Sequence, residues 1–168
     1  VSFGDNFLAK LCCDWEFEAA KAKPYGIRTL SIRLGLVLHP SGGLMKALSR
    51  PFRFYLGGHL GTGDQPVSWI RREDLCCLID FASHHPDLSG SINAVSPQGL
   101  TFKALCLAYG KAVHRPSWAH IPAFIIRLLF QERAALFLEG ASVYPQKLLD
   151  SGFVFHHLSP FESLSFDT

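Results

Sequence analysis

The sequence lacks the features that would place it in several common classes of protein. Its longest apolar run, IPAFIIRLLF at 121–130, is interrupted by Arg127 and is far shorter than the roughly 20 residues that a membrane-spanning helix needs. The formal net charge is only +2, which is too small to indicate binding to nucleic acid or to an anionic membrane surface. We therefore expect neither a membrane span nor a nucleic-acid partner.

Cysteine and histidine are present, but not at the spacings of metal sites. The five cysteines include two adjacent pairs, and none lies in a CxxC motif. Neighbouring side chains on a helix diverge by about 100° and make poor joint ligands, so we predict reduced, buried thiols and an intracellular compartment, the cytoplasm or an organelle. The pairs His84–His85 and His156–His157 lack the i,i+4 spacing of a helical metal site, and no metal is expected.

Familiar catalytic motifs are missing as well. The sequence contains no GxSxG, HExxH or DxDxDG pattern, each of which would have indicated a definite chemistry. It begins at Val1, its only methionine is Met45, and its first residues show neither the basic nor the apolar segment of a signal peptide. We therefore expect a piece of a longer protein or a processed form.

What the sequence does contain is the pattern of an α/β protein. A chain of 168 residues, 48% of them hydrophobic, can bury roughly 70% of its unfolded surface in one core. Beyond about residue 114 short helical patterns dominate, which favours an α/β core followed by a mostly helical C-terminal region. Hydrophobic periodicity predicts helices over 6–22, 44–49, 72–85 and 102–112, and strands over 27–38, 66–70, 90–95 and 152–158.

A glycine-rich loop, GGHLGTG at 57–63, raises the question of phosphate binding. A phosphate loop leads into a helix N-terminus, but this loop leads into Asp64 and a predicted strand, and it carries no lysine at the required offset. We predict a loop beside a pocket instead. Glu73 and Asp74 fit the positively polarised start of a helix, and the three tryptophans are expected to be core anchors.

Several segments, taken in order, resemble one known family. They are FLAKLCCDWEFEAA, IRTLSIRLGLVLHPSGG, LGGHLGTGDQPVSWIRREDL, SGSINAVSP, HRPSWAHIPAF and YPQKLLDSGFVF. Together they resemble the C-terminal half of an epimerase-like family in the atypical, extended branch of the short-chain dehydrogenase/reductase (SDR) superfamily. The resemblance implies the second half of a Rossmann-type doubly wound sheet over 1–114 and a small helical substrate domain over 115–168. It also implies NADP(H) as cofactor, with the glycine-rich cofactor half upstream, so that this chain alone would not bind the cofactor fully.

The same resemblance bears on catalysis and on the cofactor. The superfamily's catalytic tyrosine and lysine, four residues apart, fall at Leu8 and Cys12, which cannot perform that proton transfer, so the catalytic residues stay unknown. The resemblance places Leu8 and the segment Leu34, Gly35 and Leu36 near the nicotinamide. Plain strand-end packing is the alternative explanation for that segment.

On the substrate side the resemblance points to Gln65, Trp69 and Arg71. Gln65 matches the family's loop. Arg71 stands where relatives usually have a histidine, and its permanent charge would favour an anionic ligand.

Three hypotheses for function remain open from the sequence. The leading one is an NADP(H)-dependent oxidoreductase or epimerase-like enzyme of unknown small-molecule substrate, for which this chain supplies the substrate side. The alternative is a non-catalytic binding or scaffold protein that has lost the tyrosine and lysine. The third is an incomplete product whose exposed sheet edge and apolar surface favour association. The oligomeric state stays unknown.

Overall fold

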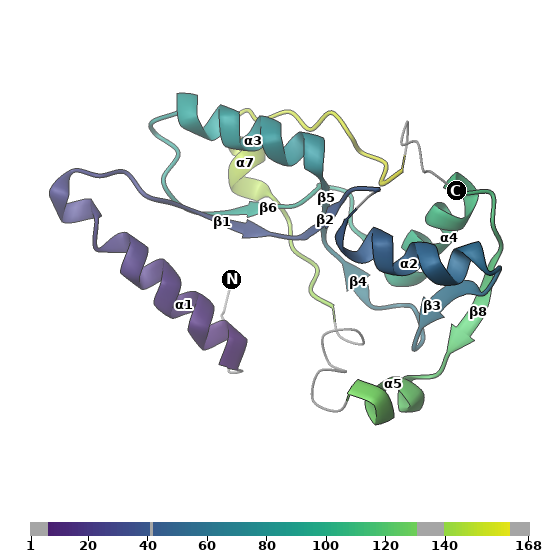
Figure 1. The fold of residues 1–168 in the computed structure, drawn as a ribbon. Helices are drawn as coiled ribbons and strands as arrows, with labels where there is room; N and C mark the ends of the chain where they lie inside the picture. The colour runs from purple at the N-terminus through teal and green to yellow at the C-terminus, as the bar shows by residue number, and fades with distance from the viewer. Residues whose placement is uncertain (1–6, 41, 131–139, 162–168) are drawn as a thin grey trace.

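The computed structural model describes residues 7–40, 42–130 and 140–161 (Figure 1). Its helices are α1 Phe7–Ala20, the short 3-10 helix η1 Lys23–Tyr25, α2 Gly43–Arg53, α3 Arg72–His84, α4 Phe102–Ala112, α5 Ala123–Phe130 and α7 Gln146–Asp150. Its strands are β1 Leu30–Leu34, β2 Leu36–Leu38, β3 Gly57–Leu60, β4 Pro66–Val67, β5 Trp69–Arg71, β6 Gly90–Ala94, β7 Leu100–Thr101 and β8 Ser117–Ile121.

The strands pair mostly in parallel and across long stretches of sequence. β1 runs parallel to β6, β2 to β5, and β3 to β8, whereas the short β4 and β7 pair antiparallel. Parallel neighbours must be joined by crossover connections, which here contain helices. The predicted α/β class is therefore confirmed.

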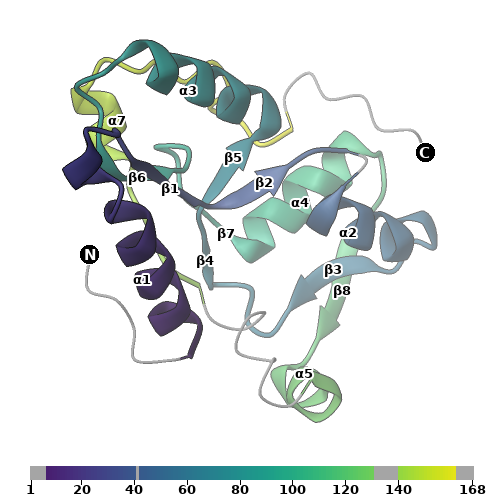
Figure 2. The same ribbon diagram turned by 60° about the vertical axis from the view of Figure 1, so that its left-hand side comes forward.

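Helices cover both faces of the β1–β6 pair. α3 and α7 lie on one face and α1 on the other, as the two ribbon views agree (Figures 1 and 2). Side chains alternate accordingly: the register partners Ile32 and Ile92 belong to the core with residues of α3 and α7. Arg33, one residue after Ile32, and Ser91, one residue before Ile92, instead reach Glu16 on α1. The alternation of these strands thus separates an apolar face from a polar one.

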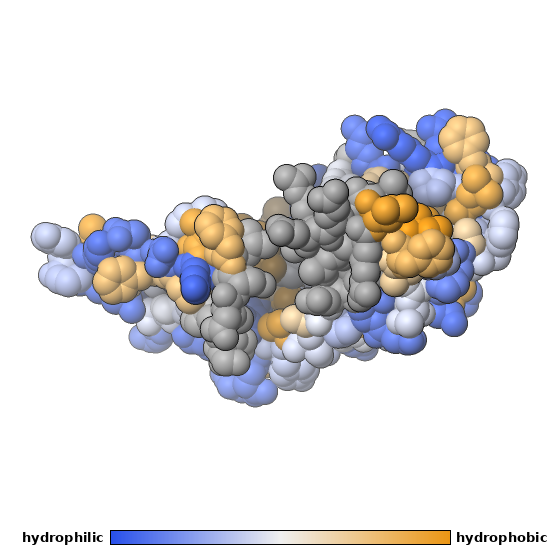
Figure 3. All heavy atoms as spheres, turned by 90° about the horizontal axis from the view of Figure 1, so that it is seen from below, coloured by the Kyte–Doolittle hydropathy of each residue, from blue (hydrophilic) through white to orange (hydrophobic). Residues whose placement is uncertain are grey.

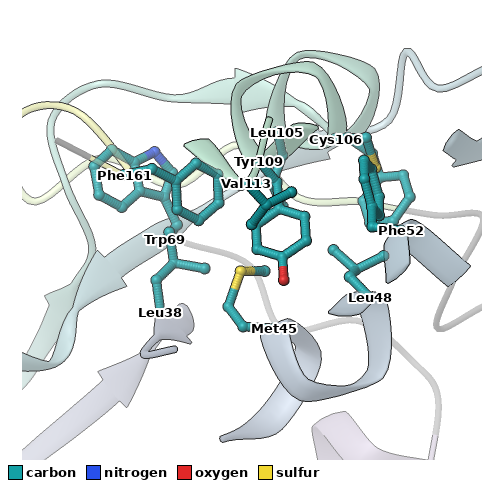
Figure 4. Close-up of a cluster of buried hydrophobic side chains, with 11 residues drawn as sticks. Leu38, Met45, Leu48, Phe52, Trp69, Leu105, Cys106, Tyr109, Val113 and Phe161 are labelled. Carbon is teal, nitrogen blue, oxygen red and sulfur yellow. The ribbon is translucent and has the colours of Figure 1, made fainter. Parts of the chain in front are cut away.

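A second core lies between α2, β5 and α4 (Figure 4). Trp69 is fully buried there, and its indole nitrogen donates a hydrogen bond to the Gln98 carbonyl at 2.7 Å. The rings of Phe52 and Tyr109 meet edge to face at 5.0 Å. Burial also raises the pKa of the Cys106 thiol to about 12, so this cysteine behaves as a small apolar residue.

The outer surface of α1 is packed much less well than these cores. Trp15 is 64% exposed and Phe17 66% exposed, and no α1 residue belongs to either buried cluster of the described chain. Apolar side chains are visible along α1 at the left of Figure 3, and others lie on α5, where Phe124 and Leu128 are exposed. Within the described ranges β1 has β6 as its one paired neighbour, so its other edge is open.

Two helix predictions are confirmed with small changes. The helix predicted over 6–22 is α1, which ends at Ala20 before η1 and the left-handed Gly26. The helix predicted over 102–112 is α4, and the Thr101 hydroxyl caps it by accepting the Ala104 N–H at 3.2 Å, as expected of this residue. No helix in the described part of the chain is both long and apolar enough to cross a bilayer.

The end of one predicted helix and the existence of one predicted strand were wrong. The helix predicted over 44–49 does not end before Pro51 but continues to Arg53 as α2. Proline weakens a helix, but a helix that ended before Pro51 would lose the contact of the buried Phe52 with Tyr109. The packing of Phe52 therefore outweighs the local effect of the proline. The segment predicted as a strand over 152–158 forms no strand, because the buried Asp74 carboxylate, and no strand neighbour, accepts the backbone N–H groups of His156 and His157, both at 3.1 Å.

The helix predicted over 72–85 is confirmed as α3, but the prediction for the cysteines was partly wrong. In α3, Leu78 and Ala82 are buried, whereas Ile79 is about half exposed. All five cysteines carry free thiols, as predicted, but of these only Cys106 is buried. Cys76 and Cys77 lie on the solvent side of α3, because the helix packs on β5 and β6 with one narrow stripe only.

Candidate substrate cavity

A cavity of about 710 Å³ lies where α2, the β1–β2 junction, the β3–β8 pair and the segment 140–144 meet. A volume of this size is typical of sites that bind small molecules. Most of its wall is aliphatic. The lining residues are Arg33, Leu34, Gly35, Leu36, Leu44, Ala47, Leu48, Pro51, Leu56, Gly58, Leu60, Gln65, Pro66, Val67, Ser68, Asn93, Val95, Phe102, Ala119, Ile121, Ala141 and Val143.

Gly35 divides the strand predicted over 27–38 and forms one end of the cavity. β1 ends before it and pairs with β6, and β2 begins after it and pairs with β5. A Cβ atom at this position would lie 2.6 Å from the Ser68 carbonyl oxygen and 2.8 Å from Val95 Cγ1. Close packing within the chain therefore requires glycine here, with or without a cofactor, so the strand-end alternative accounts for this residue.

The β3–β8 pair forms the opposite wall. A Cβ atom on Gly58 would collide with the Ala119 carbonyl, so the two backbones approach closely. Leu60 and its register partner Ile121 line the cavity. The intervening pair, His59 and His120, stack with ring centroids 5.1 Å apart and do not line it. Burial lowers the pKa of His59, helped by His120 and Lys103, although Asp64 opposes the shift.

Two polar side chains fasten the segment 140–144 over the cavity. The Ser68 hydroxyl donates to the Ala141 carbonyl at 2.7 Å and accepts the Val143 N–H at 3.0 Å. The Asn93 amide donates to the Tyr144 carbonyl at 3.2 Å. Because Ala141 and Val143 line the cavity, these hydrogen bonds hold part of its wall in place.

Among the residues that the structure describes, Arg33 is the charged side chain that lines the cavity, and it is paired. Its Nε and one terminal nitrogen donate to the two carboxylate oxygens of Glu16 at 2.6 and 2.7 Å, and Ser91 donates to the same carboxylate at 3.0 Å. The hydrogen bonds from Arg33 hold the pKa of Glu16 below its usual value against the effect of desolvation. The charge of Arg33 is therefore balanced within the chain.

The structure brings part of the predicted site together. Leu34, Gly35 and Leu36 line the cavity with Gln65, whose amide donates to the Leu60 carbonyl at 3.1 Å. Leu8 lies on α1, and its side chain is outside the described part of the molecule. Cys12 lies on an exposed face of the same helix.

Trp69 and Arg71 do not line the cavity. Trp69 is buried in the core, because β5 is buried on both faces. This agrees with the prediction made from the residue type alone. Arg71 is also buried, and its Nε donates to Glu73 at 3.0 Å. Neither placement supports the substrate-side role that the resemblance gave to these two residues.

Several residues of structural importance were not predicted. The aliphatic wall from α2 could have been found by extending the helical pattern through Pro51. Ser68 and Asn93 offered no such pattern, because their partners are backbone groups of a distant segment. Among the described residues no group of three or more histidine, cysteine or acidic side chains could hold a metal ion.

Comparison with known proteins identifies relatives over nearly the whole chain. An epimerase family protein of Mycobacterium bovis is 38% identical over 168 residues, which are 99% of this chain and 56% of that protein. Residues 121–162 match a family model described as a domain of unknown function, DUF1731. The chain thus spans about half the length of the curated relatives that it matches.

Solved structures show the same relationship. The crystal structure of human epimerase family protein SDR39U1 (isoform 2) with NADPH superposes with a TM-score of 0.74 at 30% identity, covering 79% of this chain and 45% of that one. A nucleoside-diphosphate sugar epimerase from Corynebacterium glutamicum gives a TM-score of 0.71 at 28% identity, covering 93% of this chain and 29% of that one. The fold is accordingly of the Rossmann type. In sequence and fold the chain is therefore similar to one half of the epimerase family proteins, and its residues 121–162 match the DUF1731 model.

Proposed function

We propose that this chain supplies the substrate side of an NADP(H)-dependent oxidoreductase or epimerase-like enzyme. The observation that carries the proposal is the cavity at the β1–β2 junction in a chain whose human relative was solved with NADPH. The division into a sheet domain over 1–114 and a helical domain over 115–168 is part of the same proposal, with the cavity between them.

The residues at the junction suit the nicotinamide end of the cofactor. Leu34 and Leu36 offer an apolar surface against which the flat ring could pack, and Gly35 lies between them in the same wall. When bound, the cofactor would supply or accept a hydride. This chain's own part is to orient the ring against the substrate and to keep water away from both.

Proton transfer is the weak point of the enzymatic proposal. In the described ranges the cavity is lined by no tyrosine, lysine or histidine, and its polar side chains Gln65, Ser68 and Asn93 are hydrogen-bonded within the chain. Leu8 and Cys12 do not replace the superfamily's acid–base pair. This observation favours the second candidate, a protein that binds cofactor and ligand without chemistry.

A titration with NADPH tests the cofactor proposal directly. Energy transfer from the tryptophans to the dihydronicotinamide should show weak, saturable binding, and reduced nicotinamide mononucleotide should compete, since this chain would hold only that end. Leu34→Glu should weaken binding at least about tenfold, because a charged carboxylate would replace the apolar side chain against which the ring is proposed to pack. Ile27→Glu is the matched control. Leu34 and Ile27 are both 57% exposed, but Ile27 does not line the cavity.

The outcomes separate the candidates. Binding that Leu34→Glu does not weaken, or no saturable binding at all, would contradict the cofactor proposal for this chain. If NADPH binds, oxidation of NADPH by added carbonyl compounds distinguishes the enzyme from the binding protein. If the chain proves to be a binding protein without catalysis, Leu8→Tyr combined with Cys12→Lys should create turnover that the natural chain lacks.

A further inference from the structure

We propose that the cavity binds an uncharged, mainly apolar carbonyl compound and not a nucleoside diphosphate sugar. The inference rests on the proposed function for the location of the substrate. It goes beyond that function because it assigns the chemical class of the ligand.

The wall of the cavity favours an apolar ligand. Leu36, Leu44, Leu48, Leu60, Val67 and Ile121 reach it from five different elements. An apolar ligand gains stabilisation of roughly 25 cal/mol for each Å² of its surface removed from water. A sugar, with hydroxyl groups around its ring, would instead lose hydrogen bonds to water against the same wall.

Three polar side chains of the cavity already make hydrogen bonds within the chain. Ser68 both donates to Ala141 and accepts from Val143, and the Asn93 amide donates to Tyr144. Gln65 donates to Leu60 within its own loop. A sugar hydroxyl that took over the hydrogen bond donated by Ser68 or by Asn93 would displace a contact that holds the segment 140–144 over the cavity. A ligand that needs few hydrogen bonds leaves the wall intact.

The charge balance disfavours a substrate whose diphosphate would be buried against the aliphatic wall. Two phosphates need cationic side chains or several unpaired N–H groups close by. Within the described ranges Arg33 is the only cation that lines the cavity, and Glu16 neutralises it through two hydrogen bonds below 3 Å. A diphosphate entering here would meet an aliphatic wall and an Arg33 side chain whose charge Glu16 already balances, so its own charge would be left uncompensated.

Equilibrium dialysis with a matched pair of ketones tests the proposal without any cofactor. The probes are benzophenone, para-benzoylbenzoate, which is the same ketone with one carboxylate, and UDP-glucose. Benzophenone should bind at least about tenfold more tightly than para-benzoylbenzoate, because an unpaired carboxylate loses its hydration. UDP-glucose should show no saturable binding. Tighter or equal binding of either charged probe would overturn the proposal.

A pair of variants ties the binding to the cavity. Ala47→Trp places an indole into the cavity from an exposed position on α2 and should weaken benzophenone binding at least about tenfold. Lys46→Trp adds the same indole at the neighbouring exposed position, which does not line the cavity, and should leave binding unchanged. Equal effects of the two variants, or no saturable benzophenone binding, would overturn the proposal. These readouts need no NADPH, so their failure is distinguishable from failure of the cofactor proposal.

Discussion

The two ends of this molecule hold their tryptophans in opposite ways. On the α4 side, defined by α2, β5 and α4, Trp69 is fully buried and hydrogen-bonded. On the α1 side, defined by α1 and β1, Trp15 is mostly exposed, and the link from the helix to the sheet is the cluster of Glu16, Arg33 and Ser91. The α4 side is stabilised by apolar burial and the α1 side by a partly exposed ion pair. The ion pair contributes less stability than the apolar burial. The largest mutational effects should therefore fall on the packed residues away from α1.

The largest effect is expected at Asp74, which is 1% exposed and joins α3 to the C-terminal segment. Asp74→Ala removes the acceptor for two backbone N–H groups and for the His157 ring at 3.0 Å, and should lower the free energy of unfolding by about 3 kcal/mol. Denaturant unfolding measures this. Asp80→Ala, in the exposed face of the same helix, should cost less than about 0.5 kcal/mol. Equal losses of unfolding free energy in the two variants would contradict a structural role for Asp74.

The same substitution at both tryptophans compares the two sides directly. Trp69→Phe leaves the Gln98 carbonyl without its donor and creates a small cavity, and should cost about 2 kcal/mol. Trp15→Phe should cost less than about 0.5 kcal/mol, since its ring is mostly in solvent. Chemical denaturation of both variants provides the test. A larger loss at Trp15 would reverse the comparison.

Glu16→Gln should weaken the α1 side alone. It breaks the paired hydrogen bonds to Arg33 and should cost about 1 kcal/mol, because the pair is partly exposed. Hydrogen exchange should speed up in α1 and stay constant in α4. Because the folded pKa of Glu16 is lowered, its stabilisation is present above the usual pKa of 4.5 and is lost as the pH falls through the folded value, so the variant should lose less stability in acid. An unchanged acid profile would contradict this.

The smallest effect concerns His59, a partly buried residue of β3. Its pKa is lowered from the usual 6.5, mainly by burial, so the folded state favours the neutral ring. Stability is then full above the usual pKa and falls as the pH drops through 6.5 toward the folded value. His59→Gln should reduce the loss of melting temperature between about pH 7 and about pH 5. The exposed His84→Gln is the control, and an equal reduction there would refute the assignment.

The sequence predicts the fold best where a local pattern and tertiary packing agree. The helix α4, with its Thr101 cap, follows from periodicity and side-chain chemistry alone. The bounds of α2 do not, because burial of Phe52 outweighs the local effect of Pro51. The break at Gly35 depends on Ser68 and Val95, which lie far away in sequence.

The candidate site was only partly predictable for the same reason. The cavity positions of Leu34, Gly35, Leu36 and Gln65 came from the resemblance, since no motif marks them. Trp69 lies close in sequence to these residues, but its strand is buried on both faces, and no alternation of polar and apolar residues reveals which way its side chain points. The contacts of Ser68 join it to backbone groups, which carry no sequence information.

The strand pairing also sets the order in which this chain can fold. Leu30 pairs with Gly90 and Gly58 with Ala119, each about sixty residues away, and β2 and β4 find their partners more than about thirty residues further on. On a ribosome, helices such as α1 and α2 must therefore emerge well before the strands that they cover can pair. Contacts this distant in sequence slow folding, because a long loop must close before any pairing stabilises it. The wall formed by β3 and β8 can assemble only after residue 121 has left the exit tunnel, so the cavity is among the last features of the chain to form.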